Sequence, residues 1–166
     1  MGLPTRPRHP YRWNMPVTIH SLDGARGVLV RGWGRVDDAD FLAAHRAHFA
    51  SDPEFLSLQW YAIANWSGLL ETDISPESLK AVAQLCLAAT RVSPHLLLAM
   101  VGREDLPYGL SRMFEVLAED TGWAIQSFRD EPGARKWIQE QIADRYGREV
   151  AFRKDPVAIW EPAGST

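Results

Sequence analysis

Cysteine is almost absent from this chain: Cys86 is the only one among 166 residues. A single thiol excludes an internal disulfide framework and any zinc site built mainly from cysteine. Long apolar runs are lacking as well, since no stretch approaches the roughly 18 residues that a membrane-spanning helix needs. The amino end has basic residues with no apolar segment after them, unlike a secretory signal, so we expect a cytoplasmic protein.

A large excess of charge of either sign is also missing. The formal net charge is -3 at pH 7, from 18 Lys and Arg against 21 Asp and Glu. This balance gives no general attraction to the phosphates of nucleic acids or to anionic membrane surfaces, so neither nucleic-acid binding nor membrane insertion is expected. What the chain does contain is ample apolar material, 46% of its residues, which is enough for one continuous core.

The composition divides the chain into three parts. Residues 1–15 hold three prolines among arginines and are expected to form a flexible leader. Residues 16–146 contain the strong strand and helix patterns and are expected to form one α/β domain. In residues 147–166 the patterning is weak: positions 151–160 suit either an added strand or a segment lying across the domain. Because Pro156 argues against a central strand, we interpret this part as a tail.

Five strands are predicted in residues 16–146. Apolar alternation on both sides of Asp23 and Gly24, a typical turn pair, indicates that the first two strands form an antiparallel hairpin. The third strand is almost entirely apolar or aromatic, which suits a central strand covered on both faces. The five predicted strands are 17–21, 27–34, 58–66, 95–101 and 123–128.

About four helices are predicted, one after the hairpin and one after each later strand. The first follows Asp37 or Asp38, the second follows Ser75 and the last follows Asp130, since each side chain can accept hydrogen bonds from free amides of a first helical turn. Cys86 falls on the apolar face of the second helix and is expected to be a buried thiol. A hairpin followed by strand–helix units predicts right-handed crossovers and a mixed, mostly parallel five-stranded sheet.

This order of elements and three short stretches, residues 74–77, 106–114 and 128–137, resemble the SpoIIAA-like family. That family is related to the STAS domains of anti-sigma-factor antagonists and to Sec14-type lipid-binding domains. The resemblance implies a SpoIIAA-like α/β fold and a regulatory or protein-interaction module, with a protein partner and with neither catalytic residues nor a cofactor. Kinship with Sec14-type domains implies the alternative, a carrier of a small apolar ligand such as a fatty acid.

A phosphorylation switch is a further implication of the resemblance. In the phosphorylatable members that this chain resembles, the strand before the second helix ends in Asp, and the helix opens with Asp, Ser, Gly and Leu. Here the strand is expected to end at Asn65, Asp73 and Ser75 open the helix, and a Ser-Gly-Leu triplet at Ser67 comes too early. Ser75 is topologically nearest to the phosphoacceptor, where a phosphate would meet free amides. A plain N-cap is the simpler interpretation, and we favour it.

The carboxyl ends of parallel strands meet the amino ends of helices along one edge of a sheet, which is the usual binding edge of such folds. We call the polar and aromatic residues expected there the predicted rim. Its members are Asn65, Trp66, Ser67, Asp73, Ser75, Arg103, Tyr108 and Arg129. Helix capping and solvated loops are the alternative explanation for these residues, and we favour it over a binding site.

Signatures of catalysis and metal binding are weak. Ser67 lacks the glycines that a nucleophile elbow requires two residues before and after it, because Asn65 and Leu69 stand there. His45 and His48 are three residues apart on the first helix, but no third ligand accompanies them, so no metal site is expected. An enzyme built around Ser67 or the rim carboxylates is the least favoured hypothesis.

Seven tryptophans are more than a core of this size requires. Sequential strand order places the crossover helices mainly on one face of the sheet, whereas the apolar strands indicate that both faces are covered. The terminal segments, a partner subunit or a bound lipid-like molecule could cover the second face. We put a homodimer first, because two-fold association is the commonest way to bury surplus apolar surface.

Overall fold

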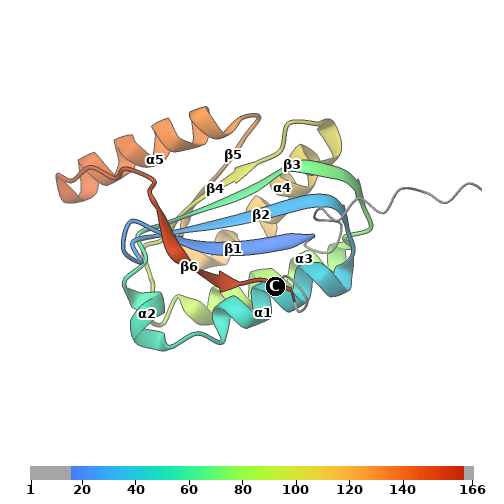
Figure 1. The fold of residues 1–166 in the computed structure, drawn as a ribbon, viewed down its shortest axis with the longest axis horizontal. Coiled ribbons are helices and arrows are strands. Elements are labelled where there is room, and N and C mark those ends of the chain that lie inside the picture. The colour runs from blue at the N-terminus through green and yellow to red at the C-terminus, as the bar shows by residue number, and fades with distance from the viewer. Residues whose placement is uncertain (1–15, 163–166) are drawn as a thin grey trace, which may run out of the picture.

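A computed structural model of the chain describes residues 16–162, so the predicted leader, residues 1–15, lies outside the described part. Strands and helices alternate along the chain in the predicted order (Figure 1). The elements are β1 (Val17–Leu22), β2 (Gly27–Val36), α1 (Asp38–Phe49), α2 (Pro53–Ser57), β3 (Tyr61–Thr72), α3 (Pro76–Ala89), β4 (Leu97–Val101), α4 (Asp105–Leu117), a 3-10 turn (Glu119–Thr121), β5 (Ala124–Phe128), α5 (Glu131–Tyr146) and β6 (Lys154–Trp160).

The strands form one mixed sheet in the order β5-β4-β3-β2-β1-β6. The β2–β3, β3–β4 and β4–β5 pairs are parallel, and β1 is antiparallel to both β2 and β6. The predicted hairpin and mostly parallel sheet are confirmed. The predicted number of strands is not, because the described part of the sheet has six.

The sixth strand comes from the segment that we interpreted as a tail. Residues 154–160 pair with β1 at the edge of the sheet, with breaks in the register. Pro156 is compatible with this place because one side of an edge strand needs no ladder hydrogen bonds. Two carboxylates fasten the segment: Asp155 accepts a 2.7 Å hydrogen bond from Ser21 Oγ, and Asp23 accepts bonds from the amides of Phe152 and Arg153 at 3.0 and 2.9 Å.

The third strand is longer and begins later than predicted. It starts at Tyr61 and continues to Thr72, because the far half of β2 pairs with it past two irregularities in the register. Residues 58–60, predicted as strand, instead connect β3 to the short helix α2, which Asp52 caps and which was not predicted. This helix raises the number of α-helices in residues 16–162 to five, against about four predicted.

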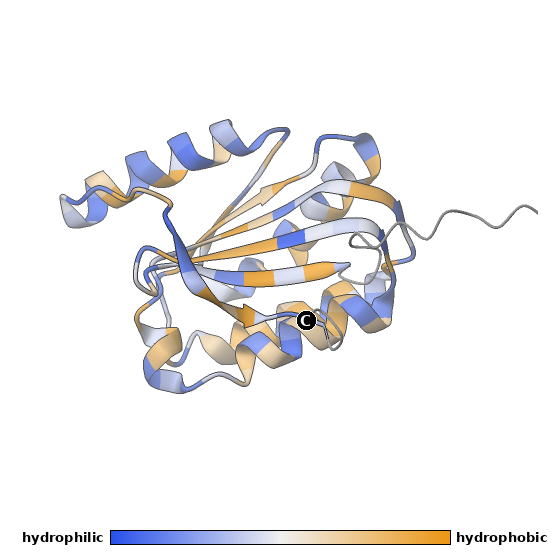
Figure 2. Cartoon of the chain, viewed as in Figure 1, coloured by the Kyte–Doolittle hydropathy of each residue, from blue (hydrophilic) through white to orange (hydrophobic). Residues whose placement is uncertain are grey.

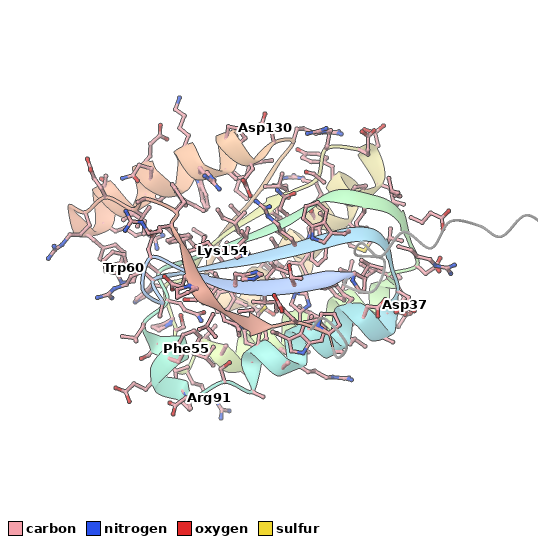
Figure 3. All side chains as sticks on the ribbon, viewed as in Figure 1. Asp37, Phe55, Trp60, Arg91, Asp130 and Lys154 are labelled. Atoms are coloured by element: carbon pink, nitrogen blue, oxygen red, sulfur yellow. The ribbon has the colours of Figure 1, made fainter. Side chains whose placement is uncertain are left out.

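Three predicted helix caps are confirmed. Asp37 accepts a hydrogen bond from the Asp40 amide, Ser75 from the Ser78 amide and Asp130 from the Gly133 amide. Figure 3 shows Asp37 and Asp130 at the starts of α1 and α5, on opposite sides of the sheet. Local capping chemistry, which needs only a few neighbouring residues, was therefore visible in the sequence.

Helices cover the two faces of the sheet unequally. α1, α3 and α4 pack on one face, and α5 packs mainly on β3, β4 and β5 of the other (Figure 1). α5 carries mostly hydrophilic residues (Figure 2), and only Ala134, Ile138 and Ile142 of this helix are buried. The second face is thus covered in part by α5 and Phe152, and the homodimer stays a prediction. None of the helices in residues 16–162 has the length and apolar character to span a bilayer.

Asp23 provides a test of how the last strand is held. Its side chain also accepts a hydrogen bond from the Tyr61 hydroxyl, whose pKa is raised by burial and by this bond. Asp23→Ala leaves two amides and one hydroxyl without their acceptor and should lower the free energy of unfolding by about 2 kcal/mol. Urea denaturation measures this loss, and hydrogen exchange should show the β6 amides becoming less protected.

Asp23→Asn is the matched control for this prediction. Asn keeps one acceptor oxygen and tolerates the left-handed backbone conformation at this position, where φ is 52°. It should therefore restore part of the lost stability. Equal losses in the Ala and Asn variants would show that the carboxylate contacts do not hold β6.

Candidate functional site

The structure confirms that one edge of the sheet collects the carboxyl ends of the parallel strands. Asn65 lies opposite Val101 in the register of β3 and β4, and Val101 lies opposite Phe128 in β5. The loop containing Arg103 and the loop containing Arg129 therefore leave the sheet side by side. The residues of the predicted rim nevertheless separate into three groups.

The first group lies inside β3 rather than after it. Asn65 donates a hydrogen bond to Glu131 of α5 at 3.3 Å and accepts one from the Ser67 amide at 2.9 Å, both on or near the second face. Trp66 points the other way: it is 8% exposed and packs against Phe41, with ring centroids 5.6 Å apart. Trp66 is thus a core residue, which corrects its placement on the rim.

The second group, Arg103, Tyr108 and Arg129, is brought together as predicted. The Arg129 guanidinium donates hydrogen bonds to the Arg103 carbonyl at 3.0 Å and to Asp105 at 2.9 Å. It also lies 4.0 Å from the centroid of the Tyr108 ring, a cation–π distance. Because Arg129 and Asp105 are both largely exposed, their ion pair adds little to stability, and the cluster forms an ordered polar surface at the edge.

The third group, Asp73 and Ser75, stands at the far end of the long β3 strand. Asp73 pairs with Arg35. Ser75 caps α3, and its amide donates a 2.7 Å hydrogen bond to Asp38 of α1. Hydrogen bonds from Ser75 and Ser78 lower the pKa of Asp38, which is therefore a carboxylate at neutral pH. A phosphate on Ser75 would meet this negative charge, so the N-cap interpretation is confirmed and the switch loses support.

Ser75 and Asp38 allow a direct test of this electrostatic conflict. Ser75→Ala should lower stability by about 1 kcal/mol through loss of the cap. Ser75→Asp keeps a capping oxygen but places a second carboxylate beside Asp38, so it should also be destabilising. Combining it with Asp38→Asn should recover stability in urea denaturation. Additive effects in this double-mutant cycle would contradict the proposed repulsion.

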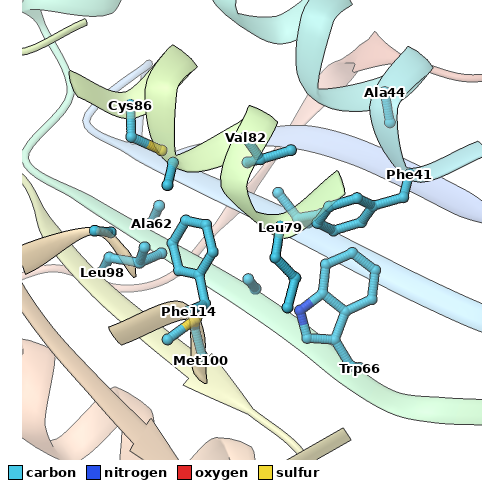
Figure 4. Close-up of a cluster of buried hydrophobic side chains, with 14 of the residues drawn as sticks. Phe41, Ala44, Ala62, Trp66, Leu79, Val82, Cys86, Leu98, Met100 and Phe114 are labelled. Carbon is cyan, nitrogen blue, oxygen red and sulfur yellow. The ribbon is translucent and has the colours of Figure 1, made fainter. Parts of the chain in front are cut away.

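Apart from the rim, the structure contains a cavity of about 90 Å³ between the sheet and α1, α3 and α4. Apolar side chains form most of its wall, including Phe41, Ala62, Leu79 and Phe114 (Figure 4). Cys86 also lines it, and burial raises the pKa of this thiol to about 12. The cysteine is therefore a neutral, unreactive part of an apolar wall, as predicted for a buried thiol.

Five polar side chains interrupt the apolar wall of the cavity: His45, His48, Gln59, Ser93 and Ser111. Nδ1 of His45 lies 2.7 Å from the carbonyl oxygen of Phe41. His48 is 6% exposed and Gln59 is 7% exposed, and among residues 16–162 neither His48 Nδ1 nor Gln59 Nε2 has a hydrogen-bond partner. Burial lowers the pKa of both histidines to about 4, so both are neutral at pH 7. No set of three or more metal-binding side chains occurs within residues 16–162.

The buried histidines predict a specific pH dependence. Unfolded histidine binds a proton below about pH 6.5, whereas the folded protein binds it only near pH 4, so stability should fall as the pH drops through this window. Each histidine accounts for roughly 3 kcal/mol of this loss. His48→Leu should reduce the slope of unfolding free energy against pH, measured by urea denaturation. The exposed His95→Leu is the control, and equal slopes in the two variants would refute the assignment.

No protein-family model matches the chain, and no curated protein matches it. An uncharacterised protein of the DUF3478 family from Shewanella loihica PV-4 is similar in structure, with a TM-score of 0.47 and 14% sequence identity, over 82% of this chain and 99% of that chain. That protein has a SpoIIAA-like fold. At this TM-score the likeness says nothing about a site or a function of this chain.

Proposed function

We propose that this protein is a non-enzymatic binding module that takes up a small apolar molecule carrying one hydrogen-bonding group. The ligand would occupy the cavity between the sheet and α1, α3 and α4. The observation that carries this proposal is a pair of atoms in a mostly apolar wall, His48 Nδ1 and Gln59 Nε2, which have no hydrogen-bond partner within residues 16–162. Buried polar atoms are nearly always paired, and a ligand group at this place would pair them.

The volume limits the size of the ligand. An apolar cavity of roughly 150 Å³ binds benzene, and this one measures about 90 Å³. It therefore suits a molecule of a few carbon atoms in the described conformation. A long acyl chain would require the helices to move away from the sheet, so the proposed carrier function concerns short ligands rather than long fatty acids.

The charge of the site limits the chemistry of the ligand. Because His45 and His48 are both neutral at pH 7, the cavity offers no cation to a buried carboxylate. Burying an unpaired charge is costly, whereas a hydroxyl or carbonyl group can bond to a side-chain amide and a neutral imidazole. The site thus favours a short alcohol, ketone or aldehyde over an acid.

The rim gives a second candidate function, the regulatory interaction module that the resemblance implies. It is favoured by the exposed cluster of Arg103, Tyr108 and Arg129 at the carboxyl edge. Helix α4 connects the two candidates, because its Pro107 and Leu110 line the cavity while Tyr108 belongs to the rim cluster. A ligand that shifts α4 would therefore change the surface offered to a partner protein.

Filling the cavity tests the first candidate. Butanol should raise the melting temperature of the wild-type protein in a concentration-dependent way, because a ligand of the folded state stabilises it by mass action. Ala62→Val adds two methyl groups to the cavity wall and should remove this response. Ala124→Val is the matched control, since Ala124 is also on a strand but packs against the second face. Differential scanning calorimetry measures both variants.

A second variant keeps this test decisive if Ala62→Val folds poorly. Gln59→Met preserves the length of the side chain and removes its amide, so it should weaken the response to butanol. A wild-type protein that responds to neither butanol nor butanone would overturn the proposal. So would an equal response of wild type, Gln59→Met and Ala62→Val, which would place binding elsewhere.

A further inference from the structure

A groove of about 880 Å³ lies on the second face of the sheet, separate from the cavity. It follows β1 and β2, the strands that α5 leaves largely uncovered, and β6 and the segment before it border it (Figure 1). Its size falls within the range of small-molecule sites, roughly 300 to 1,000 Å³. The groove is therefore large enough for a ligand that the cavity could not hold.

Cationic groups line the groove between α5 and β6. Arg31 of β2 and Arg135 of α5 share one carboxylate, Glu131, at 3.3 and 3.1 Å. Within residues 16–162, the buried Nε atoms of both arginines have no hydrogen-bond partner. Lys154 of β6 lines the same groove, and in that part of the chain its ammonium forms no ion pair. Burial and the charges of Lys154 and Arg31 lower the pKa of His20 on β1, the strand between β2 and β6, so both cations lie close to this part of the groove.

The remaining charged groups of the groove are mainly acidic. Arg35, toward the other end, pairs with Asp73 and also feels the charge of Glu71. Glu161 lies 3.5 Å from His20 across the strands β1 and β6. Because burial and the charge of Lys154 lower the pKa of His20, this imidazole is neutral at pH 7 and does not balance the charge of Glu161. The excess positive charge is therefore confined to Arg31, Arg135 and Lys154.

An aromatic surface adjoins these cations. Trp33 lines the groove with 46% of its surface exposed, and the Arg31 guanidinium lies 5.9 Å from the centroid of its ring. The ring rests on Gly68 of β3, where an added Cβ would approach it to 2.6 Å. Glycine weakens a strand, so its use here is explained by the close approach of the indole. The result is a flat apolar surface beside a cationic one.

Two candidate occupants from the protein itself do not complement these charges. Residues 1–15 contain three arginines and no acidic residue, and residues 163–166 contain no charged side chain. The charge pattern calls for an anion from outside the chain.

We propose that this groove binds a small organic anion with a flat ring, a phosphate monoester or carboxylate of an aromatic compound. The anionic group accepts hydrogen bonds from Arg31, Arg135 and Lys154 and supplies the acceptors that the two buried Nε atoms lack. The ring packs against Trp33. Arginine is suited to this role because its planar donors match carboxylate and phosphate oxygens.

Isothermal titration calorimetry with the full chain tests this assignment. The ring-bearing anions are adenosine monophosphate, naphthyl phosphate and naphthoate. Two matched probes, adenosine and naphthol, lack the anionic group. A third, inorganic phosphate, lacks the ring. At least one ring-bearing anion should bind more tightly than about 1 mM, the weak limit of specific recognition, and its matched probes should bind less tightly. Comparing the affinity of the phosphate esters with that of naphthoate shows whether the groove binds a phosphate or a carboxylate.

Three variants locate the site. Arg135→Gln and Lys154→Gln should each weaken binding of the anions by roughly tenfold, the usual effect of losing a charged hydrogen bond. Trp33→Thr should weaken only the binding of probes that carry a ring. Arg91→Gln is the control: it removes the same charge beyond the end of α3, on the side of the molecule away from Lys154 (Figure 3). Its affinity should equal that of the wild type.

Several outcomes would overturn the proposal. They are a failure of all ring-bearing anions to bind, an equal effect of Arg91→Gln and Arg135→Gln, and tight binding of a poly-glutamate peptide where the small anions do not bind. Light scattering tests a further alternative, a dimer. If Trp33→Thr or Lys154→Gln converts a dimer to a monomer, the groove is a subunit interface. None of these outcomes bears on the butanol site, because that cavity lies on the other face of the sheet.

Discussion

The alternation of side chains along β3 is the constraint on which the rest of the structure depends. Ala62 and Ala64 point toward α1, α3 and α4, while Tyr61 and Ile63 point toward α5, because successive residues of a strand face opposite sides. On the first face, two small side chains in the central strand leave room for the cavity. On the second face, the large side chains of Tyr61 and Ile63 fill the space beneath α5. This helix packs mainly on β3, β4 and β5 and leaves β1 and β2 largely uncovered.

Local chemistry explains why much of the fold could be predicted from the sequence. Asp37, Ser75 and Asp130 cap helices through bonds to residues at most three positions away, and the hairpin turn at Asp23 needs only its neighbours. β6 was missed because the hydrogen bonds that hold it run from Asp23 to Phe152 and Arg153, which are 129 and 130 positions away in the sequence. The boundary of β3 was misplaced because its far half depends on pairing with β2.

The candidate sites were harder to predict for the same reason. Arg103 and Arg129 could be placed together, since both follow parallel strands that end at one edge. Trp66 could not be placed by its type alone, because its orientation depends on the exact residue at which β3 aligns with its neighbours. His48 and Gln59 are eleven positions apart, and only the packing of α1 and α2 against the sheet brings them to one cavity.

The irregular pairing of β6 has a consequence for solubility at high concentration. An exposed strand edge with regular geometry can recruit a strand from another molecule and start aggregation. Here Pro156 removes one amide donor from the outermost strand, and the shifts in register against β1 prevent a continuous ladder. A chain shortened before Lys154 would instead present β1, a regular six-residue strand, as the template for its neighbours.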